Sequence, residues 1–186
     1  MASTVTYEFY SQTSGPKYHL PTTTHPIEWQ QMTSPQLHFR ERRAVRATLR
    51  DATGLSELVQ VIWPEHTLQA LATIIADYIS QEDSAVFTET ADGRYVGVAL
   101  CCLRHDYVEG CETSPVGYLE GVSVHEAYRH QGIAKRLVTE CEQWARNKGC
   151  SEFASDCELT NVASLAFHLS VGFQEENRII CFRKAI

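Results

Sequence analysis

Residues 122–137 read VSVHEAYRHQGIAKRL, a sequence that could hold a phosphate group. The valines are typical of a strand, and the apolar residues from Ile133 onward recur at helical spacing. Between them, Gly132 would let the backbone approach a ligand closely, and the first helical turn offers unpaired N–H groups. These groups and the helix dipole attract an anion, to which Arg129 could add a charged contact. Many helices begin in this way, so ordinary architecture is the alternative explanation.

The seven cysteines are a second group of reactive side chains. Several lie in apolar stretches, where a free thiol behaves as a small hydrophobic side chain. No cysteine pair or Cys/His cluster has the spacing of zinc ligands, so no metal site is expected. The first residues lack the basic flank and apolar core of a signal peptide, and no segment is long enough to cross a bilayer. We therefore expect a reduced, cytoplasmic protein with no membrane partner.

Periodicity and turn signals predict the elements that would position this turn. Helices are expected over the following ranges: 51–61, 64–80, 133–148 and 161–171. Strands are expected over the following ranges: 44–49, 84–90, 95–103, 117–124, 151–156 and 178–183. An Asp-Gly pair at 92–93 predicts a tight turn between the second and third strands. The order predicts an α/β domain in which helices are inserted in a mixed sheet.

Composition divides the chain into two parts. Residues 1–40 are rich in Thr, Ser, Pro and His, and should form an N-terminal extension, either a tail or a packing arm. Residues 41–186 are expected to form one domain with a substantial apolar core. The formal net charge of −7 disfavours nucleic acid as a partner and suits a cationic substrate. Many proteins are mildly acidic for solubility alone, so the charge carries little weight by itself.

Two motifs resemble those of the GCN5-related N-acetyltransferase (GNAT) superfamily. RHQGIA at 129–134 matches the pattern Q/R-x-x-G-x-G/A, which follows a strand. NVASLAFHLSVGF at 161–173 has an asparagine that opens a helix and a Gly-Phe pair that ends it. The resemblance covers about residues 44–184. It implies a GNAT fold, α/β (α+β), with a mixed, mostly antiparallel central sheet that is splayed at the acetyl-CoA site and flanked by helices.

The resemblance also implies that acetyl-CoA binds as co-substrate along this strand and turn. Backbone N–H groups of the turn would hold the pyrophosphate, and the strand would pair with the pantetheine arm. An N–H of that strand, that of Val122, would polarise the thioester carbonyl. The asparagine would bond the pantetheine from the other side. The implied cofactor-binding residues are the following: Val122, Ser123, Val124, Arg129, His130, Gln131, Gly132, Ile133, Ala134 and Asn161.

Three further segments are similar to the aminoglycoside 6'-N-acetyltransferases. They read WPEH at 63–66, RHDYVEGCETSPVGYLEGV at 104–122 and NKGCSEFASD at 147–156. The similarity implies a drug pocket lined by the following residues: Trp63, His66, Tyr107, Glu120 and Asp156. Carboxylates suit the ammonium groups of such a drug, and aromatic rings can add cation–π contacts. Each of the five also has a plain alternative as an edge, capping, packing or surface residue.

Direct attack of the amine on the thioester needs no enzyme nucleophile, so neither Cys101 nor Cys102 is required as one. We favour Glu120 as the general base and Asp156 chiefly as an ammonium anchor. Many members of the superfamily place a tyrosine near the CoA sulfur, where this chain has His168. That histidine is either the acid for the leaving thiolate or a structural partner of a backbone carbonyl.

A second departure lies after the Gly-Phe pair. Related aminoglycoside enzymes often carry an acidic residue where this chain has Asn177, and Glu175 or Glu176 could substitute for it. The expected activity is aminoglycoside 6'-N-acetylation, with antibiotic resistance either as its use in the cell or as a side activity of an older detoxifying enzyme. The alternatives are acetylation of another small amine, such as a polyamine or amino sugar, and a non-catalytic CoA-binding protein. A homodimer is expected because the family commonly forms one.

Overall fold

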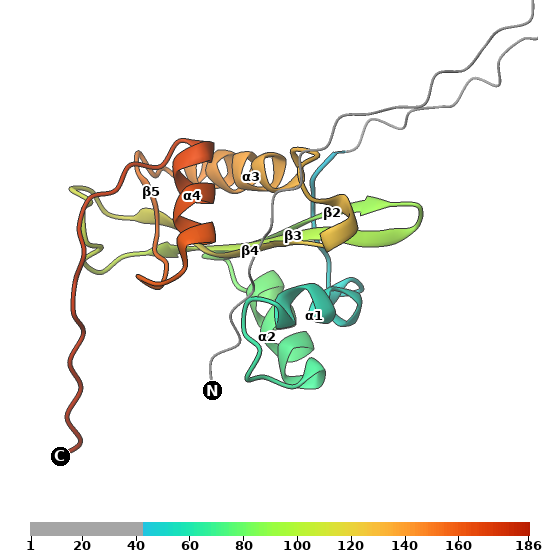
Figure 1. Cartoon of the computed structure of the whole chain (residues 1–186), viewed down its shortest axis with the longest axis horizontal. Helices are drawn as coiled ribbons and strands as arrows, with labels where there is room; N and C mark the ends of the chain where they lie inside the picture. The colour runs from blue at the N-terminus through green and yellow to red at the C-terminus, as the bar shows by residue number, and fades with distance from the viewer. Residues whose placement is uncertain (1–42) are drawn as a thin grey trace, which may run out of the picture. The chain divides into compact units, whose positions relative to one another are not determined.

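The computed structural model describes residues 43–186, so the predicted extension at 1–40 lies outside the described residues. The domain contains a five-stranded sheet in the order β1-β2-β3-β4-β5 (Figure 1). Its first four strands pair antiparallel, and β5 pairs parallel with β4. The strands are the following: β1 (Val45–Arg46), β2 (Ser84–Ala91), β3 (Arg94–Arg104), β4 (Val116–Val124) and β5 (Phe153–Ser155). The predicted mixed, mostly antiparallel sheet is confirmed.

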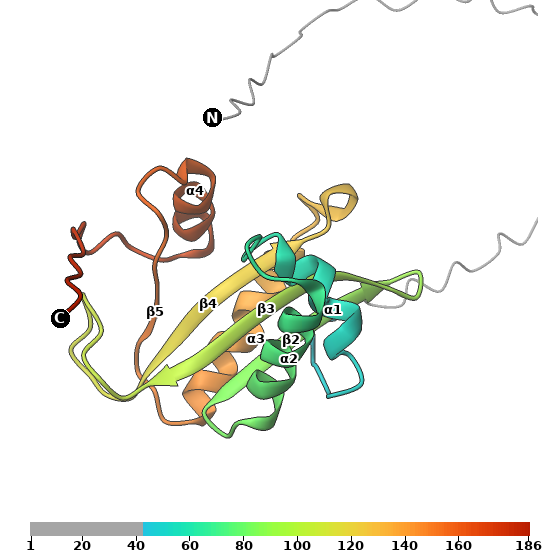
Figure 2. The same cartoon turned by 90° about the horizontal axis from the view of Figure 1, so that it is seen from below.

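Helices cover both faces of this sheet. The helices α1 (Ala52–Gln60) and α2 (Leu68–Ser80) lie on one face, and α3 (Ile133–Asn147) lies on the other (Figures 1 and 2). A short 3₁₀ helix, η1 (Glu126–Tyr128), precedes α3, and α4 (Val162–Val171) follows β5. None of the described helices has the length and apolar character needed to span a membrane.

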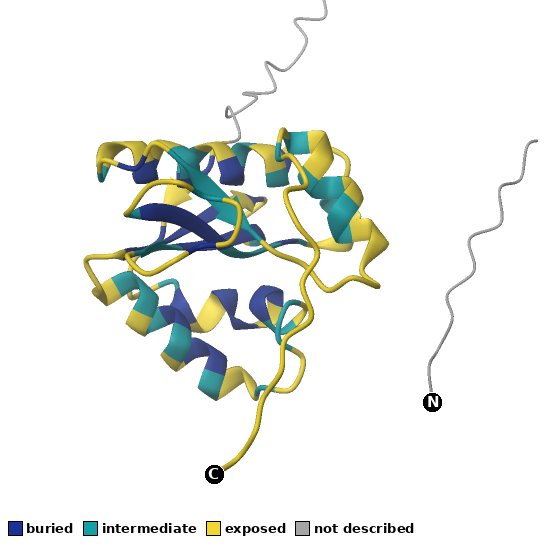
Figure 3. Ribbon diagram, turned by 90° about the vertical axis from the view of Figure 1, so that its left-hand side faces the viewer, coloured by how far each residue is buried: buried dark blue, intermediate teal, exposed yellow. Residues whose placement is uncertain are grey.

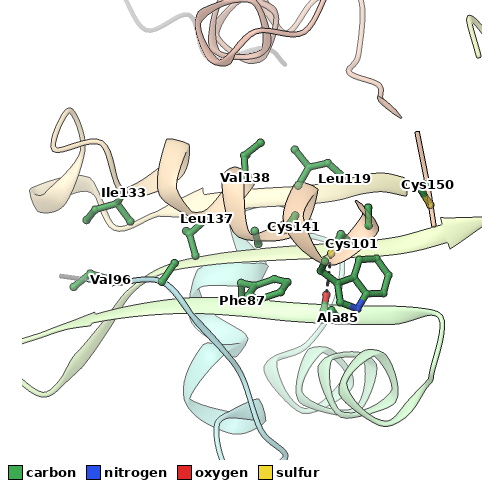
Figure 4. Close-up of a cluster of buried hydrophobic side chains, with 14 of the residues drawn as sticks. Ala85, Phe87, Val96, Cys101, Leu119, Ile133, Leu137, Val138, Cys141 and Cys150 are labelled. Carbon is green, nitrogen blue, oxygen red and sulfur yellow. Dashed lines mark hydrogen bonds between the residues drawn. The ribbon is translucent and has the colours of Figure 1, made fainter. Parts of the chain in front are cut away.

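Two buried clusters fill the space between the sheet and its helices. Phe87 of β2 packs with Leu137 and Cys141 of α3 on one face (Figure 4). Val86, the preceding residue of β2, packs with Leu55 of α1 on the other face. Because successive side chains of a strand point to opposite faces, β2 and β3 need apolar residues at nearly every position. This requirement explains the nearly continuous apolar run of β3, whereas β2 also buries the polar residues Ser84, Thr88 and Glu89.

The second helix begins later than its proline suggested. Its start was predicted at Pro64, but α2 begins at Leu68, where the Thr67 hydroxyl accepts a hydrogen bond from the Ala70 N–H at 3.2 Å. The side chain of Thr67 satisfies a free N–H group of the first turn, which a proline cannot do. Residues 64–66 therefore form a turn within the connection between α1 and α2.

The predicted last strand, residues 178–183, is not formed. Residues 174–186 have no regular secondary structure, and every one of them is exposed (Figure 3). The apolar side chains that predicted the strand are exposed too, with Ile180 at 81% and Phe182 at 92%. A strand needs a neighbouring strand to satisfy its backbone, and no described strand of this chain pairs with the segment.

Candidate active site

The sheet opens between β4 and β5, and the two candidate carboxylates lie at this opening. The parallel pairing of these strands ends where Leu119 lies opposite Ser155. Beyond that point β4 continues to Val124 with β3 on one side only, so its other edge has no strand partner among the described residues. Glu120 and Asp156 are the next residues of the two strands. The splayed sheet predicted for a ligand arm is therefore present, with one carboxylate on each side of it.

Glu120 is already bound by two donors from β3. The Arg104 guanidinium donates from Nη2 to Glu120 Oε1 at 3.0 Å, and the Cys102 thiol donates to the same oxygen at 3.0 Å. These contacts follow from the register, since Cys102 pairs with Tyr118 and alternate residues of a strand share a face. The Glu120 side chain is 20% exposed, so the carboxylate is accessible from solvent but held in place.

Asp156 is connected to the same group of side chains through Tyr118. The Tyr118 hydroxyl donates to Asp156 Oδ1 at 2.7 Å, and the Arg104 guanidinium carbon lies 3.3 Å from the centre of the Tyr118 ring. Burial raises the pKa of Tyr118, and the hydrogen bond to Asp156 raises it further. Because this hydroxyl stays protonated near neutral pH, it remains a donor that fixes the Asp156 carboxylate.

A tyrosine of α2 contributes to the electrostatics of the cleft. Burial, followed by the negative charge of Glu120, raises the pKa of Tyr78 to about 12. The connection between α1 and α2 also lies close to β4, since a Cβ on Gly121 would come within 2.9 Å of the Ile62 side chain. Glycine is therefore needed at this position of β4, and the connection forms a wall beside Glu120.

The three other predicted pocket residues have different surroundings. Trp63 is half-buried and packs against the cluster formed by α1, α2 and the sheet, so its packing role is confirmed. His66 Nε2 lies 3.3 Å from Glu65 Oε1, and Tyr107 is 80% exposed and donates to Glu109 at 2.8 Å. Among the described residues, neither of these two side chains is hydrogen-bonded to Glu120 or Asp156.

His168 lies between two serines at the opening. Its Nδ1 lies 2.7 Å from the backbone carbonyl of Ser164, which can only accept, so Nδ1 carries a proton. Its Nε2 lies 2.9 Å from the Ser155 hydroxyl, which is itself 3.0 Å from the carbonyl of Leu119. A neutral ring accepts from Ser155, whereas a protonated ring donates to it while Ser155 donates to Leu119. His168 is therefore hydrogen-bonded in both protonation states. It also bonds a backbone carbonyl, which is the structural alternative that the sequence left open.

Asn177 stands where related enzymes carry an acidic residue, and the carboxylate beside it belongs to Glu109, not to Glu175 or Glu176 as expected. The Asn177 amide nitrogen donates to Glu109 Oε1 at 2.6 Å. Glu175 is paired with Arg178, and the side chain of Glu176 packs close to Gly110. Glu109 therefore supplies an acidic group beside Asn177, and the hydrogen bonds from Asn177 and then Tyr107 lower its pKa.

The turn before α3 has the geometry of an anion cradle. His130 and Gly132 both have left-handed backbone conformations, with φ of 61° and 74°. The N–H of Arg136 makes the first hydrogen bond of the helix, to the Gly132 carbonyl, so the N–H groups before it have no helical partner. Arg129 donates from Nε to the Val124 carbonyl at 3.2 Å and so attaches the turn to the end of β4. A helix start of this kind suits an anionic group such as a pyrophosphate.

The model of the Acetyltransferase (GNAT) family matches residues 52–173. The chain belongs to this family. The aminoglycoside N(6')-acetyltransferase type 1 of Salmonella typhimurium (strain LT2) is 40% identical over 123 residues, which cover 66% of this chain and 85% of the relative. That of Stenotrophomonas maltophilia is 39% identical over 141 residues, which cover 74% of this chain and 90% of the relative.

Two solved structures have the same GNAT fold. AAC(6')-Iy in complex with the bisubstrate analog CoA-S-monomethyl-acetylneamine has a TM-score of 0.74 and 34% identity, covering 78% of this chain and 99% of that one. The aminoglycoside 6'-N-acetyltransferase AAC(6')-Ih of Acinetobacter baumannii has a TM-score of 0.73 and 33% identity, with the same coverage of 78% and 99%.

Asn161, the asparagine of the second GNAT motif, begins α4, as the sequence suggested. Asn161 caps α4, since its side-chain oxygen accepts a hydrogen bond from the Ser164 N–H at 3.0 Å. The capping uses only the oxygen, and no described residue accepts a hydrogen bond from the amide nitrogen. That nitrogen is exposed and can donate to a ligand while the cap stays intact.

Sequence reasoning missed four residues that complete the GNAT site: Cys102, Arg104, Tyr118 and Ser155. Alternation along the strands could have found three of them, because Tyr118 lies two residues before Glu120, and the register brings Cys102 and Arg104 to the same face. The role of Ser155 depends on the approach of α4 to β5, which no local pattern indicates.

We predict that Cys102 resists alkylation in the folded protein although Cys157 and Cys181 react. Burial, together with the hydrogen bond to Glu120, raises the pKa of Cys102 to about 12, so almost no thiolate forms near pH 8. Cys157 and Cys181 are exposed. Peptide mass mapping after brief iodoacetamide treatment measures the difference. Equal labelling of Cys102 and Cys157 would contradict the bond between Cys102 and Glu120.

Proposed function

We propose that this chain is an acetyl-CoA-dependent N-acetyltransferase that acetylates the 6'-amine of aminoglycosides by direct attack in a ternary complex. The observation that carries the proposal is the placement of Glu120 and Asp156 on the two sides of the opening in the sheet. The names of the relatives support the same substrate. Free cysteines suit a reducing compartment, so we place the enzyme in the cytoplasm, where acetylation would inactivate an antibiotic.

The cofactor end of the site is formed by the unpaired edge of β4 and by the turn before α3. Acetyl-CoA supplies an activated acetyl group as a thioester. The N–H groups of Gln131 to Ala134 would hold its pyrophosphate, with Arg129 and His130 beside them. The free edge of β4 at Val122 to Val124 would pair with the pantetheine arm, and an N–H of Val122 would polarise the thioester carbonyl. The Asn161 amide nitrogen would donate from the other side.

At the amine end, Glu120 would remove a proton from the substrate ammonium, directly or through a water molecule. The neutral nitrogen would then form a bond with the acetyl carbon and the carbon–sulfur bond would break. The nitrogen would lose a second proton as it becomes an amide, which balances the proton that the thiolate takes up. Asp156, held by Tyr118, would anchor a second ammonium group of the substrate. A polycation is therefore better held than a simple amine, because two separate carboxylates can each bind one of its charges.

The proton for the leaving thiolate could come from His168. Its protonated ring would be stabilised by Ser155 and the Ser164 carbonyl, and loss of the proton from Nε2 leaves a ring that accepts from Ser155. The change needs only a rotation of the Ser155 hydroxyl, so the ring does not move. This arrangement supports His168 as the group that replaces the tyrosine of other GNAT enzymes.

One observation favours a second candidate, acetylation of a different small amine such as a polyamine or amino sugar. His66 and Tyr107, two of the five expected pocket residues, are not connected to the carboxylates by hydrogen bonds. A pocket defined by Glu120 and Asp156 alone would bind any compact molecule that carries two amines at a suitable distance. In that case His66 and Tyr107, whose partners are Glu65 and Glu109, would not contribute to the choice of substrate.

A matched pair of drugs tests the proposed function. Kanamycin carries a 6'-amine and paromomycin a 6'-hydroxyl, so we expect CoA release from acetyl-CoA with kanamycin and none with paromomycin. Release of CoA and loss of the drug's primary amine measure the reaction. Equal slow turnover of both drugs would exclude the 6' position, and faster turnover of a polyamine than of either drug would favour the second candidate.

Glu120→Gln should lower kcat for kanamycin by about a hundredfold or more, because an amide cannot take up the proton. Glu112→Gln is a matched control, since this exposed residue uses only its backbone N–H in the described contacts. It should retain the kcat of the unmodified enzyme. An unchanged kcat in the Glu120 variant would show that another group, such as Asp156, is the base.

We also propose that the enzyme is a homodimer held together by residues 174–186. This extended segment exposes Ile179, Ile180 and Phe182 to solvent (Figure 3). Exposed apolar surface is unfavourable, and contact with a second copy of the chain would bury it. Its four consecutive apolar residues, from Ile179 to Phe182, suit a strand, and β5 is an edge strand of only three residues that could accept a neighbour. The strand predicted at 178–183 would then form between two copies.

Ile180→Asp combined with Phe182→Asp should convert the dimer to the 21.0 kDa monomer, because charges in a paired apolar segment are strongly unfavourable. Val61→Asp is the control, because Val61 is also apolar and exposed but lies at the end of α1. This variant should stay dimeric. Light scattering coupled to size-exclusion chromatography measures both masses. A dimer that survives the double substitution would show that the contact lies elsewhere.

A further inference from the structure

An ion pair between a buried carboxylate and a half-buried guanidinium lies beside the turn before α3. Glu89 of β2 is 0% exposed, and Arg136 of α3 binds both of its carboxylate oxygens. Arg136 Nε donates to Oε2 at 2.9 Å and Nη2 donates to Oε1 at 2.7 Å. A carboxylate inside a domain is destabilising unless it is fully paired, and such pairs often contribute little to stability even then. Its presence in the core therefore suggests another role.

The third nitrogen of the same guanidinium reaches the turn. Arg136 Nη1 donates to the backbone carbonyl of Gln131 at 3.1 Å. Gln131 lies between His130 and Gly132, the two residues with left-handed backbones. A left-handed backbone is unfavourable for a residue such as histidine and persists only where surrounding contacts hold it. The hydrogen bond from Arg136 is such a contact, at the centre of the turn.

The direction of this hydrogen bond determines where the next N–H group points. In a trans peptide the carbonyl oxygen and the following N–H lie on opposite sides of the chain. Because the Gln131 carbonyl points to the half-buried Arg136 guanidinium, the Gly132 N–H points away from that guanidinium. The fit is close, since a Cβ on Gly132 would lie 3.2 Å from Arg136 Nη1. Glycine is thus required both by its backbone conformation and by the guanidinium beneath it.

We propose that Glu89 and Arg136 are positioning residues that hold the turn in the conformation that binds the pyrophosphate of CoA. This inference rests on the proposed function, because it needs CoA as the ligand of the turn. All three nitrogens of Arg136 are used within the protein, and its charge is balanced by Glu89. The pair therefore acts by orienting the Gly132 N–H group and not by attracting the phosphate itself.

Arg136→Lys tests the proposal. Lysine keeps a positive charge beside Glu89, but its single nitrogen cannot bind the carboxylate and the Gln131 carbonyl in the same geometry. We expect the Kd for CoA, measured by titration calorimetry without any amine, to rise about tenfold or more. The KM for acetyl-CoA should rise in parallel, whereas kcat at saturating acetyl-CoA and the KM for kanamycin should stay within about twofold.

Arg146→Lys is the matched control, because Arg146 lies on the same helix and forms an exposed pair with Glu142. Its Kd for CoA should equal that of the unmodified protein. If Arg136→Lys does not fold, Glu89→Leu combined with Arg136→Met leaves no unpaired buried charge and should show the same loss of CoA affinity.

The outcomes separate this inference from the proposed function. Unchanged CoA affinity in the folded Arg136 variants would overturn the positioning role while the proposed function stands. Equal rises in both KM values would also overturn it, since a general loss of structure does not distinguish the two substrates. If the unmodified protein bound no CoA, both the proposed function and the inference would be wrong.

Discussion

The end of the pairing between β4 and β5 is the constraint on which the rest of the site depends. Up to Leu119 and Ser155 the two strands satisfy each other's backbone, and beyond them the edge of β4 is left open. An open edge is normally unfavourable in a sheet, but here it lies between two carboxylates and leads to the turn before α3. From this point β4 continues towards the turn before α3, whereas β5 leads into α4. The end of one strand pairing therefore positions both the turn and the residues around His168.

Charge in the cleft is arranged differently from a simple acidic pocket. Both carboxylates are hydrogen-bonded to neutral or cationic groups of β3 and β4, and tyrosines with raised pKa values surround them. Burial and hydrogen bonding act in the same direction on Tyr118 and Cys102: both raise the pKa, so the hydroxyl and the thiol remain protonated and donate to the two carboxylates. The GNAT fold supplies the frame, and these alternating side chains give the cleft its chemistry.

Most of the fold could be predicted because its strands and helices have strong local signals. The Asp-Gly turn at 92–93 is formed with φ of 51° and 75°, and α4 ends at Gly172 with φ of 106°, as their residue types indicated. The strand predicted at 178–183 was wrong, because its apolar run favours a strand locally but no described strand pairs with it. In the site, Glu120 and Asp156 were found by resemblance. The contacts that Arg104 and Ser155 make depend on register and helix approach, which one sequence does not encode locally.

The guanidinium of Arg104 has a consequence for selectivity. It is a cation attached to the protein at a high effective concentration beside Glu120, so the ammonium of the proposed substrate would have to displace it. A monoamine replaces one positive charge by another and gains little from the exchange. A polyamine that also reaches Asp156 gains a second ion pair, and the released guanidinium regains water. For the proposed substrate, this exchange would favour a molecule with several ammonium groups over a monoamine.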